Sequence, residues 1–291
     1  MPSHNLGQIT LCDLDILGYS VAGEETVIAM PQLDVCFEVG KAPEQIIPIN
    51  NVLLSHGHID HTSGLAYYLS HRKFSGIATG TLLVPAQLTT AIQKILEGWA
   101  ILDGSPIPVN LIPMKQGDEY EVRPNLFARA FYTQHVRGSL GFCLIEKRRK
   151  LKTEYLSLTG PEIVDLKKQG IAIDNTIEMP IVTYLGDTEP GSFLDYDFVT
   201  NSKILITECT FFYEDHIDRA RSGHHSHVND LAPMLESLKC EHIIISHITQ
   251  RTGLNDIKYI LRKRLSQETY NKIIILSQST FESCAKIKSE T

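Results

Sequence analysis

The sequence lacks any uninterrupted apolar run that approaches the ~20 residues a membrane-spanning helix requires. Its first residues, M-P-S-H-N-L-G, also lack the basic segment followed by an apolar stretch that marks a secretory signal. Basic residues are not in excess, since 34 Asp and Glu outnumber 27 Lys and Arg and the formal net charge is −7. The chain is therefore expected to be cytoplasmic, with no membrane partner. Any nucleic acid would have to be held by a local basic patch.

A cysteine framework is missing as well. The six cysteines lie far apart, form no C-x-x-C pair, and mostly have apolar neighbours, so neither disulfides nor a thiolate zinc site is expected. With 43% hydrophobic and 21% charged residues the composition is that of a globular chain, and 291 residues allow one large domain or two smaller ones.

The densest group of candidate metal ligands lies in residues 51–62, which read N-V-L-L-S-H-G-H-I-D-H-T. The apolar run predicts a buried strand that leads straight into a polar turn. If the chain stays extended, period-two spacing points His56, His58 and Asp60 to one side, and the turn lets His61 reach a second nearby point. This pattern predicts two metal ions. The alternative is a polar loop with ordinary surface histidines.

Four later segments share a design in which an apolar run of strand length ends at a polar residue. The runs L-F-A-R-A-F-Y-T-Q-H, M-P-I-V-T-Y-L-G-D, S-K-I-L-I-T-E and E-H-I-I-I-S-H end at His135, Asp187, Glu208 and His247. One site drawn from residues 56 to 247 argues against independent domains, so a single domain over 1–291 is predicted. The seven predicted metal ligands are His56, His58, Asp60, His61, His135, Asp187 and His247. Imidazole and carboxylate ligands favour zinc, with manganese or iron as alternatives.

Structural roles can also be predicted for one carboxylate, two helical segments and the single tryptophan. Asp34, in Q-L-D-V-C-F-E-V-G, is expected either to cap a turn or to support a metal-binding histidine. Residues 63–72 and 86–102 are predicted to be helical, the second beginning after Pro85. Trp99 is expected to pack in the core.

The H-x-H-x-D-H turn, the later lone His, the G-D-T strand end and the final S-H together resemble the metallo-β-lactamase fold superfamily. A narrower resemblance, over about residues 28 to 252, is to ribonuclease Z, the endonuclease that trims the 3′ end of precursor tRNA. Y-L-G-D-T-E-P, I-T-E-C-T-F-F, G-H-H-S-H and I-I-S-H-I-T-Q-R follow that family's order, and K-R-R-K-L-K-T-E-Y-L-S-L-T-G-P-E-I-V-D-L-K-K-Q-G is similar to the short plant members. The resemblance implies an α/β fold, a four-layer αββα sandwich with the site at one edge.

The resemblance also implies roles for individual residues. Two sets of three ligands would each hold one ion, with Asp187 bridging them: His56, His58 and His135 in one set, and Asp60, His61 and His247 in the other. The implied catalytic residues are Asp60, Glu208 and His225. Of these, Glu208 and His225 would form a proton relay that protonates the leaving 3′ oxygen. His227 is the alternative proton donor, because the G-H-H-S-H motif leaves the register open.

The basic cluster of Lys147, Arg148, Arg149 and Lys150 is the best candidate for binding phosphate. By resemblance it marks a shortened tRNA-contacting arm at about residues 145–160, and the alternative is a solvated hairpin turn. The expected activity is endonucleolytic removal of the 3′ trailer from precursor tRNA, by a homodimer. The alternatives are hydrolysis of a small ester, such as a cyclic nucleotide or another phosphodiester, and a non-catalytic binding protein.

Overall fold

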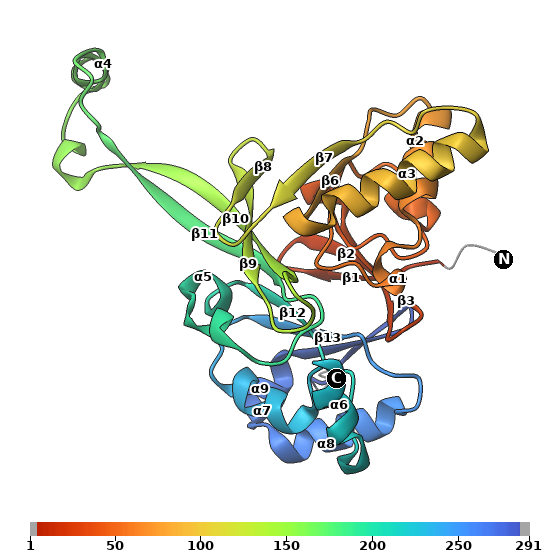
Figure 1. The fold of residues 1–291 in the computed structure, drawn as a ribbon. Coiled ribbons are helices and arrows are strands. Elements are labelled where there is room, and N and C mark those ends of the chain that lie inside the picture. Colours follow the sequence, from red (N-terminus) through yellow and green to blue (C-terminus); the bar gives the residue numbers. More distant parts are fainter. Residues whose placement is uncertain (1–4, 286–291) are drawn as a thin grey trace, which may run out of the picture.

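The computed structural model describes residues 5–285 and arranges them as two sheets packed face to face with helices on both outer faces (Figure 1). The strand order is β1 to β7 in the first sheet and β15 to β8 in the second. This arrangement confirms the predicted four-layer αββα sandwich.

Each sheet mixes antiparallel and parallel pairs. In the first sheet, β1 to β4 pair antiparallel and β4 to β7 pair parallel. In the second, β11 to β14 are parallel and the strands on either side are antiparallel. The first-sheet strands are β1 (Gly7–Leu11), β2 (Leu14–Val21), β3 (Glu25–Met30), β4 (Val35–Phe37), β5 (Asn51–Leu53), β6 (Thr81–Pro85) and β7 (Asn110–Met114). The second-sheet strands are β8 (Glu119–Arg123), β9 (Leu126–Tyr132), β10 (Leu140–Leu151), β11 (Asp174–Tyr184), β12 (Ile204–Glu208), β13 (His242–Ser246), β14 (Ile273–Ser277) and β15 (Thr280–Ser283).

The strand sequences are apolar on both faces because both faces are covered. In β12, Ile204 and Ile206 lie in the cluster between the sheets, whereas Leu205 lies in the cluster beneath the helices. This alternation follows from the period of two along a strand. Between the sheets, the rings of Phe37 and Tyr184 stack with their centroids 4.7 Å apart. The two sheets therefore share one core directly behind the site.

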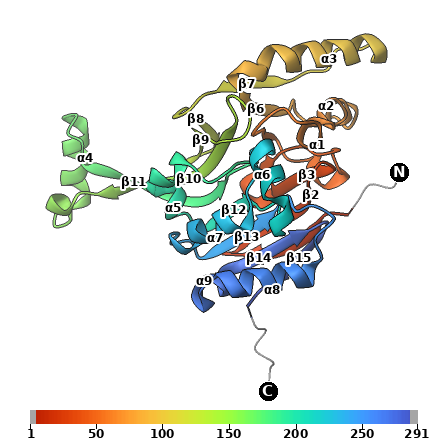
Figure 2. The ribbon, with the colours of Figure 1, turned by 60° about the horizontal axis from the view of Figure 1, so that its bottom comes forward.

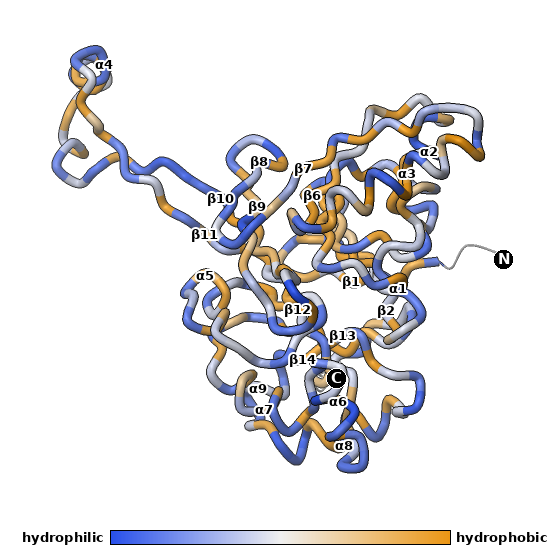
Figure 3. The backbone as a smooth tube through the Cα atoms, in the orientation of Figure 1, coloured by the Kyte–Doolittle hydropathy of each residue, from blue (hydrophilic) through white to orange (hydrophobic). Residues whose placement is uncertain are grey.

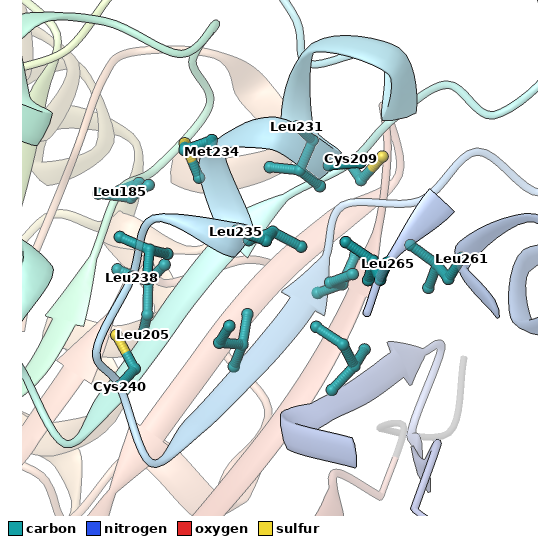
Figure 4. Close-up of a cluster of buried hydrophobic side chains, with 14 of the residues drawn as sticks. Leu185, Leu205, Cys209, Leu231, Met234, Leu235, Leu238, Cys240, Leu261 and Leu265 are labelled. Atoms are coloured by element: carbon teal, nitrogen blue, oxygen red, sulfur yellow. The ribbon is translucent and has the colours of Figure 1, made fainter. Parts of the chain in front are cut away.

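Helices cover the outer faces. Figure 4 shows the second-sheet side, where Leu231 and Leu235 of α7 pack with Leu261 of α8 and Leu205. The helices are α1 (Ile59–Thr62), α2 (Leu65–Phe74), α3 (Thr89–Asp103), α4 (Gly160–Lys168), α5 (Asp197–Thr200), α6 (Ile217–Gly223), α7 (Val228–Glu236), α8 (Leu254–Arg264) and α9 (Gln267–Lys272). Short 3₁₀ turns occupy Pro31–Leu33, Glu44–Ile46, Ala86–Leu88, Thr153–Tyr155, Ser192–Asp195 and Glu214–His216. Among the described residues, no helix combines the length and the hydrophobicity that crossing a membrane demands.

The two predicted helices correspond to α2 and α3, but the prediction for Trp99 is wrong. Its side chain is 52% exposed. Helix α3 buries Ile92 and Leu96, and no residue of this helix beyond Leu96 is buried, so its last turns lie clear of the sheet. Pro85 is the last residue of β6 and precedes a 3₁₀ turn.

A two-stranded arm projects from the second sheet. β10 and β11 pair from Phe142 and Tyr184 out to Leu151 and Asp174, whereas β10 pairs with β9 only as far as Glu146. Beyond that point the two strands stand clear of the body in both views and carry α4 at their tip (Figures 1 and 2). The outer part of β10 is hydrophilic (Figure 3). The arm, defined here as residues 147–179, is therefore longer than the predicted 145–160.

Candidate metal centre

All seven predicted ligands meet at one edge of the sandwich, where β5, β9, β11 and β13 end. They fall into two groups whose ligand atoms lie within 4.8 Å of one another. The first group is His56, His58, His135 and Asp187, and the second is Asp60, His61 and His247. The fold thus brings together side chains as distant in the chain as His56 and His247.

Asp187 lies between the two groups. Its Oδ2 is 3.2 Å from Nε2 of His247, 3.4 Å from Nε2 of His61 and 3.7 Å from Nε2 of His56. Burial disfavours its charge, but His247 and His61 outweigh that effect and hold the pKa of Asp187 well below its usual range. An ionised carboxylate among imidazoles is the arrangement that a ligand shared by two cations requires.

The donor set fits divalent cations. Nε2 of His56 and Nε2 of His61 are buried without a hydrogen-bond partner, and an unpaired buried polar atom costs about 1–3 kcal/mol. Burial also lowers the pKa of His56 well below its usual value, so this imidazole is neutral and its lone pair is free to bind a metal. A cation at this position would satisfy atoms that the described residues leave unpaired.

Three of the five histidines are oriented by a hydrogen bond at their second ring nitrogen. In each case Nδ1 pairs with a protein oxygen, which fixes the ring so that Nε2 faces the cluster. These pairs are His56 with Oγ of Ser55 (2.9 Å), His135 with the carbonyl of His224 (3.1 Å) and His247 with Oγ1 of Thr210 (2.9 Å). Nδ1 of His61 lies 3.4 Å from Oε1 of Glu38, an ion-pair distance without a hydrogen bond among the described residues.

Glu38 was missed by the sequence analysis. It is fully buried, accepts a hydrogen bond from the backbone N of Ser55 (3.1 Å), and faces His61. Asp34, the carboxylate singled out in the same run, takes the first of its two expected roles. It ends a 3₁₀ turn with φ of 55° and accepts hydrogen bonds from the backbone and side chain of Asn50 (2.7 and 2.8 Å). The signal for Glu38 was present as a second carboxylate in V-C-F-E-V-G.

The hairpin of β2 and β3, in the first sheet, contacts two of the ligands. The backbone N of Gly23, in the turn after β2, donates to Oδ2 of Asp60 (2.9 Å). Oγ of Ser20 accepts a hydrogen bond from the backbone N of His247 (2.8 Å). Residues near both ends of the described chain therefore hold the ligand cluster together.

Glu208 and His225 form a pair beside the cluster. Nδ1 of His225 lies 2.8 Å from Oε1 of Glu208, and the His225 ring stacks on the ring of His247 with centroids 5.3 Å apart. Burial lowers the pKa of His225, but Glu208 overrides that effect and raises it to about 9. Glu208 is itself held by the backbone N of Thr188 (2.8 Å) and Oγ1 of Thr210 (2.6 Å).

His227 has a different environment. Its ring is buried and caps α7, with Nδ1 accepting from the backbone N of Asn229 (3.2 Å) and Nε2 donating to the carbonyl of Tyr213 (3.0 Å). Both ring nitrogens are therefore occupied away from the cluster. The geometry favours His225 over His227 as the partner of Glu208.

Two cavities border the ligands. The first, of about 630 Å³, is lined by five residues of the centre, which are His58, Asp60, Asp187, His225 and His247, and by other residues that include Arg219 and Arg251. The second, of about 980 Å³, lies along residues 132–138 and includes His135, with Glu189 and His224 on its wall.

The four residues of the predicted basic cluster lie on β10, in the arm, but their environments differ. Lys147 pairs with Glu119 (2.6 Å) at the base of the arm, and Arg148 pairs with Glu146 (2.8 Å). Arg149 and Lys150 are exposed and have no ion-pair partner in the described part of the chain. Two of the four predicted cations are thus neutralised by neighbours, and two are free to meet an external anion.

Comparisons with known proteins agree with this geometry. A family model of the β-lactamase superfamily domain matches residues 31–248. tRNase Z TRZ1 of Arabidopsis thaliana is 31% identical over 246 residues, covering 84% of this chain and 88% of the relative. tRNase Z TRZ2, chloroplastic, of the same plant is 30% identical over 266 residues, covering 90% and 75%.

Solved structures show the same fold at lower identity. The metallo-β-lactamase fold protein YhfI from Bacillus subtilis superposes with a TM-score of 0.63 at 14% identity, covering 95% of this chain and 96% of that one. The short form of human tRNase Z gives 0.56 at 13% identity, covering 96% and 97%. At such identities the structural likeness establishes the fold alone.

Proposed function

The chain belongs to the tRNase Z family of the β-lactamase superfamily, and from that premise we propose that it is a metal-dependent endoribonuclease that removes the 3′ trailer from precursor tRNA. The observation that carries the proposal is the meeting of seven potential ligands in two groups around Asp187, with the Glu208–His225 pair alongside.

We assign the ligands in two sets. His56, His58 and His135 would hold one cation, Asp60, His61 and His247 the other, and Asp187 would bind both. The chemistry that two divalent cations supply in such a site is Lewis acidity at the phosphate oxygens and a nucleophile at neutral pH. Zinc is the preferred assignment for imidazole and carboxylate donors, and manganese or iron also fits them.

The chain's own residues handle the leaving group. With its pKa raised to about 9, His225 is protonated at neutral pH, and its Nε2 is the nitrogen that Glu208 leaves free. It therefore holds a proton that it can donate to the departing 3′ oxygen, while Glu208 fixes the tautomer and stabilises the imidazolium. The products would be a tRNA with a 3′-hydroxyl and a trailer with a 5′-phosphate.

The arm would hold the tRNA body. Arg149 and Lys150 are exposed without ion-pair partners among the described residues, and Lys167 lines the same hollow at the arm as Arg149. Lys147 and Arg148 would instead fix the geometry of β10 through Glu119 and Glu146. On this division, Arg149 and Lys150 are the two residues of the predicted basic cluster that would bind phosphate.

The primary test incubates metal-loaded protein with a precursor tRNA and, separately, with a bis-aryl phosphodiester. Trailer release with a 3′-hydroxyl on the tRNA supports the proposal. Cleavage of the small ester alone would favour the small-molecule hydrolase.

The arm has its own test. Changing Arg149 and Lys150 together to Ala is expected to flatten the slope of log affinity against log salt for precursor tRNA by roughly 0.7–0.9 for each phosphate that no longer meets a cation. Changing Lys147 and Arg148 together should weaken binding without a matching decrease in slope. Identical slopes for the wild type and both variants would favour the alternative, in which the basic cluster is only a solvated hairpin turn.

We also propose a homodimer in the cytoplasm. Helices α2 and α3 expose large apolar side chains, including Tyr67 and Trp99, which border a cavity of about 260 Å³. Such a surface favours a second copy of the chain as its cover. Sedimentation of the wild type and Trp99→Asp tests the assembly, with a monomeric variant as the expected result. Microscopy of a tagged chain tests the location, since one plant relative is named chloroplastic.

A further inference from the structure

The two cavities are neighbours at the centre, since His58 lines the first and His135 lines the second. Nε2 of His135 lies 3.2 Å from Nδ1 of His58, which lines the first cavity, whereas His135 itself lines the second. A phosphodiester within a polynucleotide has a chain leaving it in both directions. An endonuclease therefore needs room on both sides of the bond it breaks, and this centre has it.

The position of His225 gives the direction of the strand, and this step rests on the proposed function. His225 lines the first cavity and not the second. If its Nε2 protonates the leaving 3′ oxygen, the nucleotide that carries that oxygen, the last one of the mature tRNA, occupies the first cavity. The nucleotides beyond the scissile phosphate then have the second cavity open to them.

The second cavity has the chemistry to hold a single strand. Tyr132, the last residue of β9, is 50% exposed there, so its ring face is available to a base. Arg137 is exposed and has no ion-pair partner among residues 5–285, in a chain whose net charge is −7. An aromatic ring beside a free guanidinium is the usual pairing in sites that bind single-stranded nucleic acid, because the ring stacks on a base and the cation meets a phosphate.

The wall of this cavity is fixed in place. Nε2 of Gln87 donates to the carbonyl of Arg137 (3.0 Å), and Gln87 fills the space that a Cβ on Gly138 would need. Gly138 has φ of +77°. The one carboxylate on the wall, Glu189, would repel phosphate but is paired with Nδ1 of His224 (3.1 Å). The turn that presents Arg137 is therefore already in position before any ligand arrives.

We propose that this second cavity is the trailer subsite: Tyr132 stacks on a trailer base next to the scissile bond, and Arg137 binds a phosphate further along the trailer. Such a subsite would not read the base sequence of the trailer, since stacking and phosphate binding are both independent of base identity.

Trailer length provides the test. Two precursor tRNAs with the same body carry trailers of one nucleotide and of about six, because a single-nucleotide trailer has no phosphate beyond the scissile one for Arg137 to meet. In Arg137→Ala, the ratio of kcat/KM for the long trailer to that for the short one is expected to fall about tenfold, the usual order for losing one hydrogen bond between charged groups. Lys239→Ala removes an exposed cation before the amino end of β13, the end opposite His247, and is the matched control, whose ratio should equal that of the wild type.

Equal decreases on both trailers, or no decrease, would overturn the assignment of Arg137. Tyr132→Ala should lower kcat/KM on the long trailer, whereas Tyr132→Phe, which keeps the ring, should largely retain it. An equal loss in the two variants would exclude stacking.

Photo-crosslinking of 4-thiouridine at the first trailer nucleotide gives a readout apart from activity. Crosslinks are expected on residues 132–138, and crosslinks near Arg219 instead would reverse the direction of the strand. If the wild-type protein hydrolyses the aryl ester but cuts neither precursor tRNA, the proposed function is wrong. This result is distinct from a failure of the trailer subsite, which only the variants can show.

Discussion

Replacing Gly186 by Ala tests how tightly the two sheets fix the central carboxylate. Gly186 directly precedes Asp187 and has φ of +66°. A Cβ at this position would lie 2.7 Å from Cβ of Ser55 and 2.8 Å from its Oγ. Ser55 cannot easily move away, because it is buried, its Oγ lies 2.9 Å from Nδ1 of His56, and its backbone N donates to Glu38 (3.1 Å).

The expected cost has two parts. A non-glycine residue in the left-handed region costs about 1–2 kcal/mol, and forcing an extra methyl into a well-packed site costs about 1–3 kcal/mol more. Gly186→Ala should therefore lower the free energy of unfolding by about 2–5 kcal/mol. Because the strain falls between Asp187 and the residue that orients His56, the metal content should fall as well.

Gly76→Ala is the matched control. Gly76 has nearly the same φ, +68°, but nothing lies within 4 Å of the position a Cβ would take, so only the backbone part of the cost applies. Urea unfolding measures the stabilities, and elemental analysis of protein purified without chelator measures the metal. Equal destabilisation of the two variants, or full metal content in Gly186→Ala, would refute the argument that Ser55 and Asp187 are held close together.

Three further outcomes are expected. Elemental analysis should find close to two metal ions per chain in the wild type and fewer in Asp187→Ala, because the Asp187 carboxylate faces both ligand groups. An unchanged metal content would exclude a carboxylate shared by two ions. His225→Ala should keep its metal yet lose turnover by roughly 10²–10⁴-fold, whereas His227→Ala should keep turnover and lose about 1 kcal/mol of stability as a missing helix cap; a cleavage assay and urea unfolding separate the two. Partial burial raises the pKa of Glu119, but hydrogen bonds from Lys147 and Arg129 outweigh that effect and lower it. The ionised Glu119 therefore stabilises the fold fully above its unfolded pKa near 4.5, and this stabilisation is lost as the pH falls through the lowered folded pKa. Thermal unfolding of the wild type and Glu119→Gln should therefore converge in acid, and a constant difference would contradict this.

Four of the residues that meet at the candidate metal centre could be found from the sequence because they follow a local rule. His135, Asp187, Glu208 and His247 each end an apolar run, and the carboxyl ends of parallel strands meet at one edge of a sheet. Strand length and polarity are both readable from neighbouring residues, so the four could be found without knowing what lies beside them.

Features that depend on distant neighbours could not be predicted in the same way. The spacing of Trp99 identifies the face of α3 on which it lies, but not that burial along this helix stops at Leu96. Asp34 and Glu38 share one run, and only the position of His61 shows which of them supports a ligand. The extent of the arm likewise depends on where β9 stops pairing with β10.

The choice between His225 and His227 depended on one backbone angle. His224 ends α6 in the left-handed region, with φ of 52°. That turn directs His225 toward Glu208 and leaves His227 to begin α7. A positive φ is uncommon for residues other than glycine, so the sequence motif alone offered no reason to expect the turn at this position.

The hydrogen bond between Ser20 and His247 has a consequence for how the protein is made. These residues are separated by 227 positions, and β13, which delivers His247, lies between β12 and β14 in the sheet. As the chain leaves the ribosome from its amino end, His56 to Asp187 emerge long before the strand that completes their ligand set. A nascent chain therefore carries an unfinished set of ligands until the later-emerging β13 has taken its place beside β2.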